Sequence, residues 1–179
     1  KEIIDDLLML TRMDNSVSTL NISLVNINTL VERMLKKLTP LADEKNIEIV
    51  YESMRDIEAE VDDIKLTQVV TNLVENAIKY NVPGGKVIVT LNADIDSFFL
   101  RIQDTGIGIP EEHQKNIFQR FYRVDKARSR ETGGTGLGLS IVDSIISSHG
   151  GQIKVVSKTV ADGEKFGETV FTIKIPLKH

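Results

Sequence analysis

The chain has 179 residues, of which 41% are hydrophobic and 27% charged, and its formal net charge is -4. Cysteine is absent, which excludes disulfides, thiolate metal sites and a thiol nucleophile, and His113, His149 and His179 lie too far apart for the paired ligands of a zinc site. The acidic balance argues against nucleic acid as a partner, and no apolar run approaches the roughly 18 residues of a membrane span. Because the chain opens at Lys1 rather than Met, we expect a piece of a longer protein.

Apolar spacing predicts the elements of the first half of the chain. An amphipathic helix occupies residues 1–15, and because it buries little by itself we expect it to pack against a partner helix. A polar linker follows at 16–20. The next elements are a strand over 22–25, a helix over 30–41 that Pro40 bends or ends, strands Ile47–Tyr51 and Ile57–Val61, and a helix Asp62–Tyr80 with Asp62 and Asp63 placed to cap it.

The second half predicts a hairpin, two helices and two final strands. In order, these are strands Lys86–Leu91 and Phe98–Gln103, a glycine-bearing loop Asp104–Pro110, a short helix Glu111–Phe121, a helix Leu137–Ser148 and strands Ile153–Ser157 and Thr169–Ile175. Strands and helices mix without strict alternation, which favours a two-layer α+β sandwich.

A polar stripe runs along the helix Asp62–Tyr80. At 100° per residue, Asn72, Asn76 and Lys79 share one face, beside an apolar arc that suits the core. Amide oxygens there suit a hard cation and the lysine suits phosphate, although a solvated helix face has the same pattern. The apolar arc consists of Leu66, Val69, Val70, Leu73 and Ala77.

Two glycine-bearing segments are further candidates. Asp104-Thr-Gly106-Ile-Gly108 follows a strand, and its glycines let the backbone approach a ligand while Asp104 accepts from an amino group; an ordinary turn is the alternative. Residues 133–138 run into a helix and suit an anion, but they match neither a Walker loop nor the dinucleotide fingerprint. The basic side chains upstream of this segment either close over phosphates or belong to a solvent-exposed loop; they are Arg123, Lys126, Arg128 and Arg130.

Taken in series, these segments closely resemble four sequence boxes of sensor histidine kinases, whose ATP-binding domain is shared with gyrase-type ATPases. The asparagine box matches 72–80, the first glycine box 104–108, the phenylalanine box 118–123 and the second glycine box 133–138. The resemblance extends over 21–176, and residues 2–15 resemble the end of the second helix of the dimerisation and histidine-phosphotransfer domain.

The resemblance implies the Bergerat ATP-binding fold, with a mixed sheet of about five strands and about three helices on one face, plus a short N-terminal helix. It implies that residues 1–15 are the end of the second helix of the dimerisation and phosphotransfer domain. Residues 16–20 would be a linker, and residues 21–179 would form the ATP-binding catalytic domain.

The resemblance also implies roles for individual residues. Asn76, with Asn72, holds Mg2+ against the ATP phosphates, Lys79 contacts phosphate, and Tyr80 lies along the nucleotide. The adenine amino group meets Asp104, in a pocket that Gly106, Gly108 and Ile109 shape. The phosphate side of the site would be formed by Gly134, Thr135, Gly136, Leu137 and Gly138. Residues 123–135, including Arg123 and Lys126, would form a lid over it. Phe118 and Phe121 would either anchor this lid or pack into the core.

The expected reaction is phosphoryl transfer. Hydrolysing relatives carry a glutamate where this chain has Asn72, whose amide cannot act as a general base, and Glu75 is only a secondary candidate. None of the histidines fits the phosphoacceptor box: His149 suits a partly cationic helix terminus, and His113 suits solvent. We therefore expect the chain to bind Mg-ATP without phosphorylating itself.

The expected partners follow from the same resemblance. They are ATP, the protein's own phosphotransfer domain in a dimeric parent, and the aspartate of a response-regulator receiver domain. The chain would belong to the cytoplasmic portion of a membrane-anchored sensor without touching the membrane itself. An anti-sigma-type serine kinase and a non-catalytic interaction module on the same fold are the alternatives.

Overall fold

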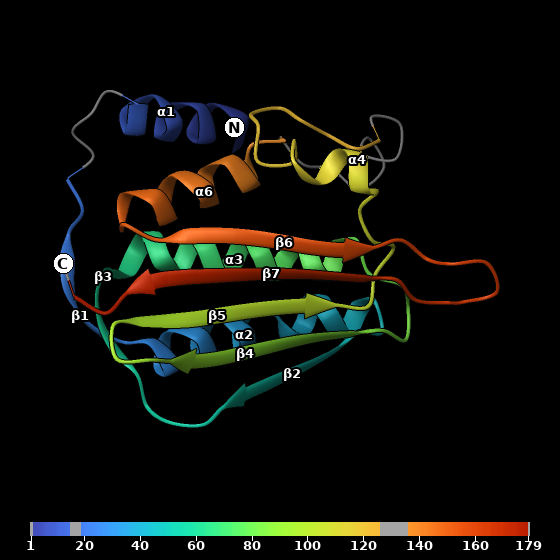
Figure 1. The fold of residues 1–179 in the computed structure, drawn as a ribbon, viewed down its shortest axis with the longest axis horizontal. Coiled ribbons are helices and arrows are strands. Elements are labelled where there is room, and N and C mark those ends of the chain that lie inside the picture. Colours follow the sequence, from blue (N-terminus) through green and yellow to red (C-terminus); the bar gives the residue numbers. More distant parts are fainter. Residues whose placement is uncertain (1, 15–18, 126–135, 179) are drawn as a thin grey trace.

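A mixed five-stranded sheet forms one layer of the structure, in the order β2-β4-β5-β7-β6 (Figure 1). The computed structural model describes residues 2–14, 19–125 and 136–178. β2 pairs with β4 in parallel and the other neighbours are antiparallel. The strands are β2 (Glu48–Ser53), β4 (Lys86–Ala93), β5 (Ser97–Asp104), β7 (Glu168–Pro176) and β6 (Gln152–Lys158).

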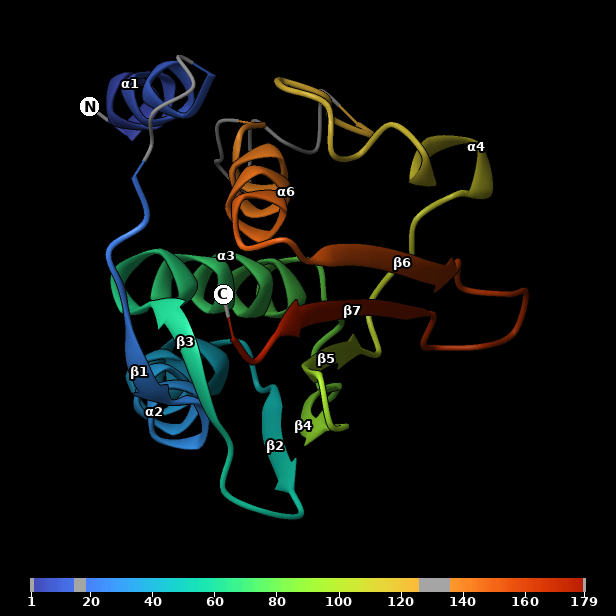
Figure 2. The same cartoon turned by 60° about the vertical axis from the view of Figure 1, so that its left-hand side comes forward.

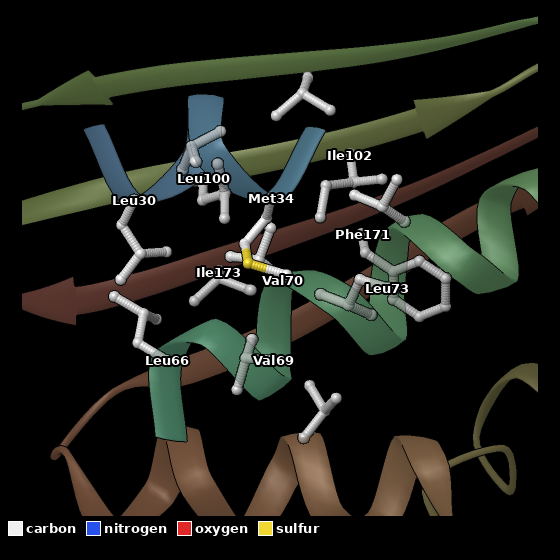
Figure 3. Packing of buried hydrophobic residues seen from close by; sticks show 14 of the residues in the cluster. Leu30, Met34, Leu66, Val69, Val70, Leu73, Leu100, Ile102, Phe171 and Ile173 are labelled. Atoms are coloured by element: carbon white, nitrogen blue, oxygen red, sulfur yellow. The ribbon is translucent and has the colours of Figure 1, made fainter. Parts of the chain in front are cut away.

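Three helices cover one face of this sheet: α2 (Ile27–Glu44), α3 (Asp63–Lys79) and α6 (Gly138–Ser148) (Figures 1 and 2). Side chains of α2 and α3 point into the space between these helices and strands β5 and β7 (Figure 3). The two-layer α+β prediction is confirmed. The labelled core residues are Leu30, Met34, Leu66, Val69, Val70, Leu73, Leu100, Ile102, Phe171 and Ile173.

The start of α3 is a junction between three parts of the chain. As predicted, Asp62 is the N-cap, and its Oδ1 accepts the Lys65 N–H at 3.1 Å. Its Oδ2 accepts the Asn21 N–H at 2.9 Å, and its own N–H donates to Nε2 of His149 at 3.0 Å. One residue thus joins the first residues after the linker to α3 and to the end of α6.

His149 is neutral, which corrects the expectation of a partly cationic side chain. It is fully buried, and its Nδ1 donates to the carbonyl oxygen of Ile145 at 2.8 Å while Nε2 accepts from Asp62. Since a carbonyl only accepts and a backbone N–H only donates, the ring holds one proton, on Nδ1. Its role as a structural residue stands.

Two helix predictions differ from the structure. α2 begins at Ile27 and continues past Pro40 to Glu44, so the proline does not end the helix; Pro40 is exposed, and the buried Ala42 continues the core stripe. The expected helix 111–121 shortens to α4 (Glu111–Gln114), followed by tight turns that bury Ile117. After those turns, the backbone of Phe121 is in the left-handed region, with a φ of 61°, and its N–H donates to Gly136 O at 2.9 Å.

The strand that leads directly into α2 and the strand that leads directly into α3 do not join the main sheet. β1 (Ile22–Asn26) and β3 (Glu58–Asp62) form a separate antiparallel pair. The N-terminal helix α1 (Glu2–Asp14) contacts α6, and its Leu10 is buried in the core. The expected partner helix is therefore α6 on this side, while other apolar side chains of α1 remain exposed, namely Ile3, Ile4, Leu7 and Leu8.

Replacing Asp62 tests the junction. We expect Asp62→Ala to lower the free energy of unfolding by about 1–2 kcal/mol, because the Lys65 and Asn21 N–H groups both lose their acceptor. Asp63→Ala is the matched control, since Asp63 forms an exposed ion pair with Arg33 at 3.3 Å and a weak contact with Thr67, so its loss should be clearly smaller. Urea unfolding measures both, and equal losses would contradict the junction.

Candidate functional site

The predicted polar stripe lies on the C-terminal half of α3. Asn72, Asn76 and Lys79 are half-buried, next to the fully buried Leu73 and Ile78. Nδ2 of Asn72 donates to Gly138 O at 3.3 Å, in the first turn of α6. This bond brings the asparagine stripe beside the second glycine segment and leaves the amide oxygen of Asn72 as the atom that can hold a cation.

Positive charge gathers at the end of α3. Burial lowers the pKa of Lys79, the positive charges of Arg123 and Lys45 lower it further, and Glu75 opposes them. Lys79 Nζ also lies 5.3 Å from the ring centre of Tyr80. Such an electropositive, partly desolvated place favours an anion. Lys45, which directly follows α2, had no signal in the sequence because only the fold brings it near Lys79.

Asp104 ends β5 as a buried carboxyl, 5% exposed. Burial raises its pKa to about 7, the negative charge of Glu168 adds to this rise, and the Gly106 N–H opposes it. That N–H donates to Oδ1 at 2.9 Å. The strand register places the equally buried Thr169 of β7 beside Asp104, a neighbour that the sequence analysis missed because pairing is decided by the sheet.

The first glycine segment is held by contacts within the protein. A Cβ on Gly106 would collide with Tyr80 O, and one on Gly108, whose φ is 75°, would collide with the carbonyl of Lys158. Ile107 N–H donates to Tyr80 O at 3.1 Å, and Ile109 N–H donates to Ser157 Oγ at 2.8 Å. The glycines therefore let the loop pack against α3 and β6, which holds Tyr80 near Asp104.

The second glycine segment is described from Gly136 onwards. Gly136 has a φ of 75° and its oxygen accepts the Phe121 N–H, Leu137 is fully buried, and Gly138 begins α6. Among the described residues, no side chain caps this helix, and a helix N-terminus of this kind can hold an anion. Lys126, Gly134 and Thr135, together with Arg128, Arg130 and Gly133, lie outside the described residues.

The phenylalanine segment has two different parts. Phe118 packs edge-on against Phe171, with ring centres 6.2 Å apart, whereas Phe121 is 54% exposed. His113 is not a solvated side chain as expected, since its Nδ1 is hydrogen bonded to the Tyr122 hydroxyl and the ring is half-buried. This bond ties α4 to the residues that precede Arg123.

Residues 61–179 match the family model described as "Histidine kinase-, DNA gyrase B-, and HSP90-like ATPase". The chain belongs to this ATPase family. It is 37% identical over 177 residues to the sensor histidine kinase RppB of Synechocystis sp., covering 98% of this chain and 38% of RppB. It is 34% identical over 180 residues to the sensor histidine kinase WalK of Bacillus subtilis, covering 99% of this chain and 28% of WalK.

Solved structures agree with this assignment to the family. The catalytic domain of histidine kinase ThkA superposes with a TM-score of 0.75 at 28% identity, covering 89% of this chain and 97% of that domain. Full-length ShkA in complex with AMPPNP superposes with a TM-score of 0.82 at 27% identity, covering 98% of this chain and 35% of ShkA. The chain thus has the fold of a histidine kinase ATP-binding catalytic domain. Neither the serine-kinase nor the interaction-module alternative finds support.

The buried carboxyl of this ATPase domain should make its stability depend on pH. The folded state keeps the Asp104 proton up to about pH 7, whereas the unfolded chain releases it near the ordinary value of 3.8. The unfolded state therefore binds fewer protons between these values, and the free energy of unfolding should fall as pH rises from about 4 to about 7. Between about pH 4 and about pH 7, we expect the free energy of unfolding of the unsubstituted protein to fall by on the order of 1–4 kcal/mol more than that of Asp104→Asn.

Chemical unfolding of both proteins at intervals of pH measures this difference. Asp162→Asn, on the exposed turn between β6 and β7, is the control and should follow the unsubstituted protein. Parallel pH profiles for the unsubstituted protein and Asp104→Asn would contradict the assignment.

Proposed function

We propose that the chain is the catalytic domain of a sensor histidine kinase, which binds Mg-ATP and transfers the γ-phosphoryl group to a histidine of its own phosphotransfer domain. A response-regulator aspartate would then receive the group. ATP binding follows from the family, whereas the acceptor, the metal and the residue roles are our inference. The chain spans well under half of RppB and of WalK, at 38% and 28% of their lengths, so the whole protein's activity remains a proposal.

The Asn72–Gly138 hydrogen bond carries this proposal. It places the asparagine stripe of α3 against the N-terminal turn of α6. The Ile107–Tyr80 hydrogen bond then joins the Asp104 loop to the C-terminal end of α3. Phosphates placed beside Lys79 and Arg123 would meet positive charge and the N-terminal end of α6, while the base would meet Asp104. Positioning and charge neutralisation supply most of the catalysis in phosphoryl transfer.

The donor atoms fit Mg2+. Amide oxygens are hard ligands, and with its Nδ2 donated to Gly138 the Asn72 side chain has only its oxygen left for a cation, beside that of Asn76. The described residues contain no cluster of three or more His, Asp or Glu side chains suited to a metal, so we propose that phosphate oxygens would supply further ligands. When bound, the ion would neutralise charge on the phosphate oxygens.

Hydrolysis is disfavoured by the same residues. Asn72 occupies the position at which hydrolysing relatives carry a glutamate, and an amide does not accept a proton at neutral pH. Glu75 is exposed, and its charge acts on Lys79, so it is poorly placed to activate water. The γ-phosphoryl group would therefore be kept for the histidine acceptor.

The relatives suggest the wider setting. The structure of ThkA in complex with the response regulator TrrA covers 98% of this chain at 26% identity, and we propose a receiver domain as a partner here too. We also propose that α1 continues into a dimeric phosphotransfer domain, in the cytoplasmic portion of a membrane-anchored sensor. None of the described helices is both long and apolar enough to cross a bilayer.

Asn76→Ala tests the metal site. We expect nucleotide affinity in the presence of Mg2+ to fall at least about tenfold, because an oxygen ligand is lost, while affinity without Mg2+ changes little. Isothermal titration with AMPPNP, with Mg2+ and with EDTA, measures both values. Asn92→Ala, on an exposed part of β4, is the control and should bind as the unsubstituted protein does. The same loss under both conditions would assign Asn76 a structural role instead.

Phosphorylation with labelled Mg-ATP tests the reaction. We expect no acid-labile label on this chain, because none of His113, His149 and His179 matches a phosphoacceptor box. In addition, His149 is buried and His113 is bonded to Tyr122. Label should appear on a histidine when the phosphotransfer domain of a relative is supplied. Acid-labile label on this chain alone, or acid-stable label on the supplied domain, would refute the proposal.

A further inference from the structure

Three polar side chains lie in a row across the helix-facing side of the sheet. Asp104 on β5 pairs in register with Thr169 on β7, and Thr169 pairs with Ser157 on β6. Along β5 and β7 the alternate positions of this face bury Ile102, Leu100, Phe171 and Ile173, so the three polar residues continue the core face at its end near α4. Neighbouring side chains of such a row are about 5 Å apart at Cβ.

The hydrogen bonds of Ser157 determine where its proton lies. Its Oγ accepts the Ile109 N–H at 2.8 Å, lies 2.7 Å from the Glu168 carbonyl oxygen and lies 2.7 Å from Thr169 Oγ1. A hydroxyl has one proton, and a carbonyl oxygen can only accept. Ser157 therefore donates to Glu168, and the Thr169 hydroxyl donates to Ser157.

The direction of this chain of bonds gives the row a single polarity. With its proton directed to Ser157, Thr169 has only lone pairs left for a ligand. Asp104 accepts the Gly106 N–H through Oδ1. Its pKa is raised to about 7, so above that pH it is a carboxylate whose Oδ2 is also an acceptor, and the binding measurements belong in that range of pH. The row therefore presents acceptors only, and suits a ligand edge that donates.

We propose that Ser157 is a positioning residue for base selection: by holding the Thr169 proton, it makes the site favour a 6-amino purine over a 6-oxo purine. This inference rests on the proposed function, in which Asp104 meets the nucleobase. The amino group of adenine donates to the row, whereas a 6-oxo group in the same position would face acceptors, and buried polar groups without partners weaken binding strongly.

The test compares ATP with inosine triphosphate, which carries a 6-oxo group in place of the 6-amino group. We expect the unsubstituted protein to bind ATP at least about tenfold more tightly, measured by isothermal titration with Mg2+. In Ser157→Ala the Thr169 hydroxyl can turn and donate to a 6-oxo group, so the ratio of the two dissociation constants should fall by about tenfold.

The ratio separates this role from a structural one. Ser157→Ala also removes the acceptor of the Ile109 N–H, but a loosened loop would weaken both nucleotides by the same factor and leave the ratio unchanged. An unchanged ratio would overturn the proposal. Ser157→Thr keeps a hydroxyl and should restore the ratio. Ser148→Ala removes an exposed hydroxyl on α6 that donates to Ser144 O, and it should change neither constant.

A second pair of variants keeps the proposal testable if Ser157→Ala does not fold. Thr169→Val removes the hydroxyl itself and should reduce the ratio. Ser157→Cys, whose thiol is a weak hydrogen-bond partner, should also reduce the ratio, and in the Thr169→Val background it should have no further effect. A ratio unaffected by Thr169→Val would refute the inference. If the unsubstituted protein bound neither nucleotide, the proposed function would fail first, whereas tight ATP binding with an insensitive ratio would leave that function standing and remove only the role of Ser157.

Discussion

The burial of α3 is the constraint on which the rest of the structure depends. Its apolar side chains fill the space against the sheet and the flanking helices α2 and α6 (Figure 3). Burying each such side chain contributes about 1.5–3 kcal/mol, so turning the helix by one residue would expose leucine and valine and bury amides. The helix therefore has one rotation, and that rotation sends Asn72, Asn76 and Lys79 to the side where α6 begins.

The loops of the site are positioned by contacts with elements that are already in place. The Ile107 N–H of the Asp104 loop donates to Tyr80 O, and Asn72 donates to Gly138 O in the first turn of α6. Asp62 is hydrogen bonded both to Asn21, just before β1, and to His149 at the end of α6. Glycines at 106 and 108 allow backbone to meet backbone where a Cβ would collide. The same neighbours that stabilise the fold thus set the distances between the parts of the nucleotide site.

Much of the fold could be predicted because its signals are local. Alternating apolar residues located all of the strands to within two residues at each end, and Asp62 marked the start of α3. The signals failed where tertiary packing overrides propensity: Pro40 sits on an exposed helix side, and the helix expected after Pro110 breaks into turns that bury Ile117. His149 looked cationic from its helix position, yet the N–H of Asp62, distant in sequence, keeps its ring neutral.

By itself the sequence determined which residue types stand at which intervals: the asparagines and lysine on one helix face, the glycines in two loops, and the absence of any cysteine. The order of these motifs resembles that of sensor histidine kinases, and this resemblance indicated the ATPase family. Periodicity and turn chemistry act over a few residues, and they indicated the helices, the strands and an α+β fold. Only the tertiary structure decided which chain segments meet. The pairing of β5, β7 and β6 puts Asp104, Thr169 and Ser157 in one row, and the direction of their hydrogen bonds depends on a proton count that no local pattern contains.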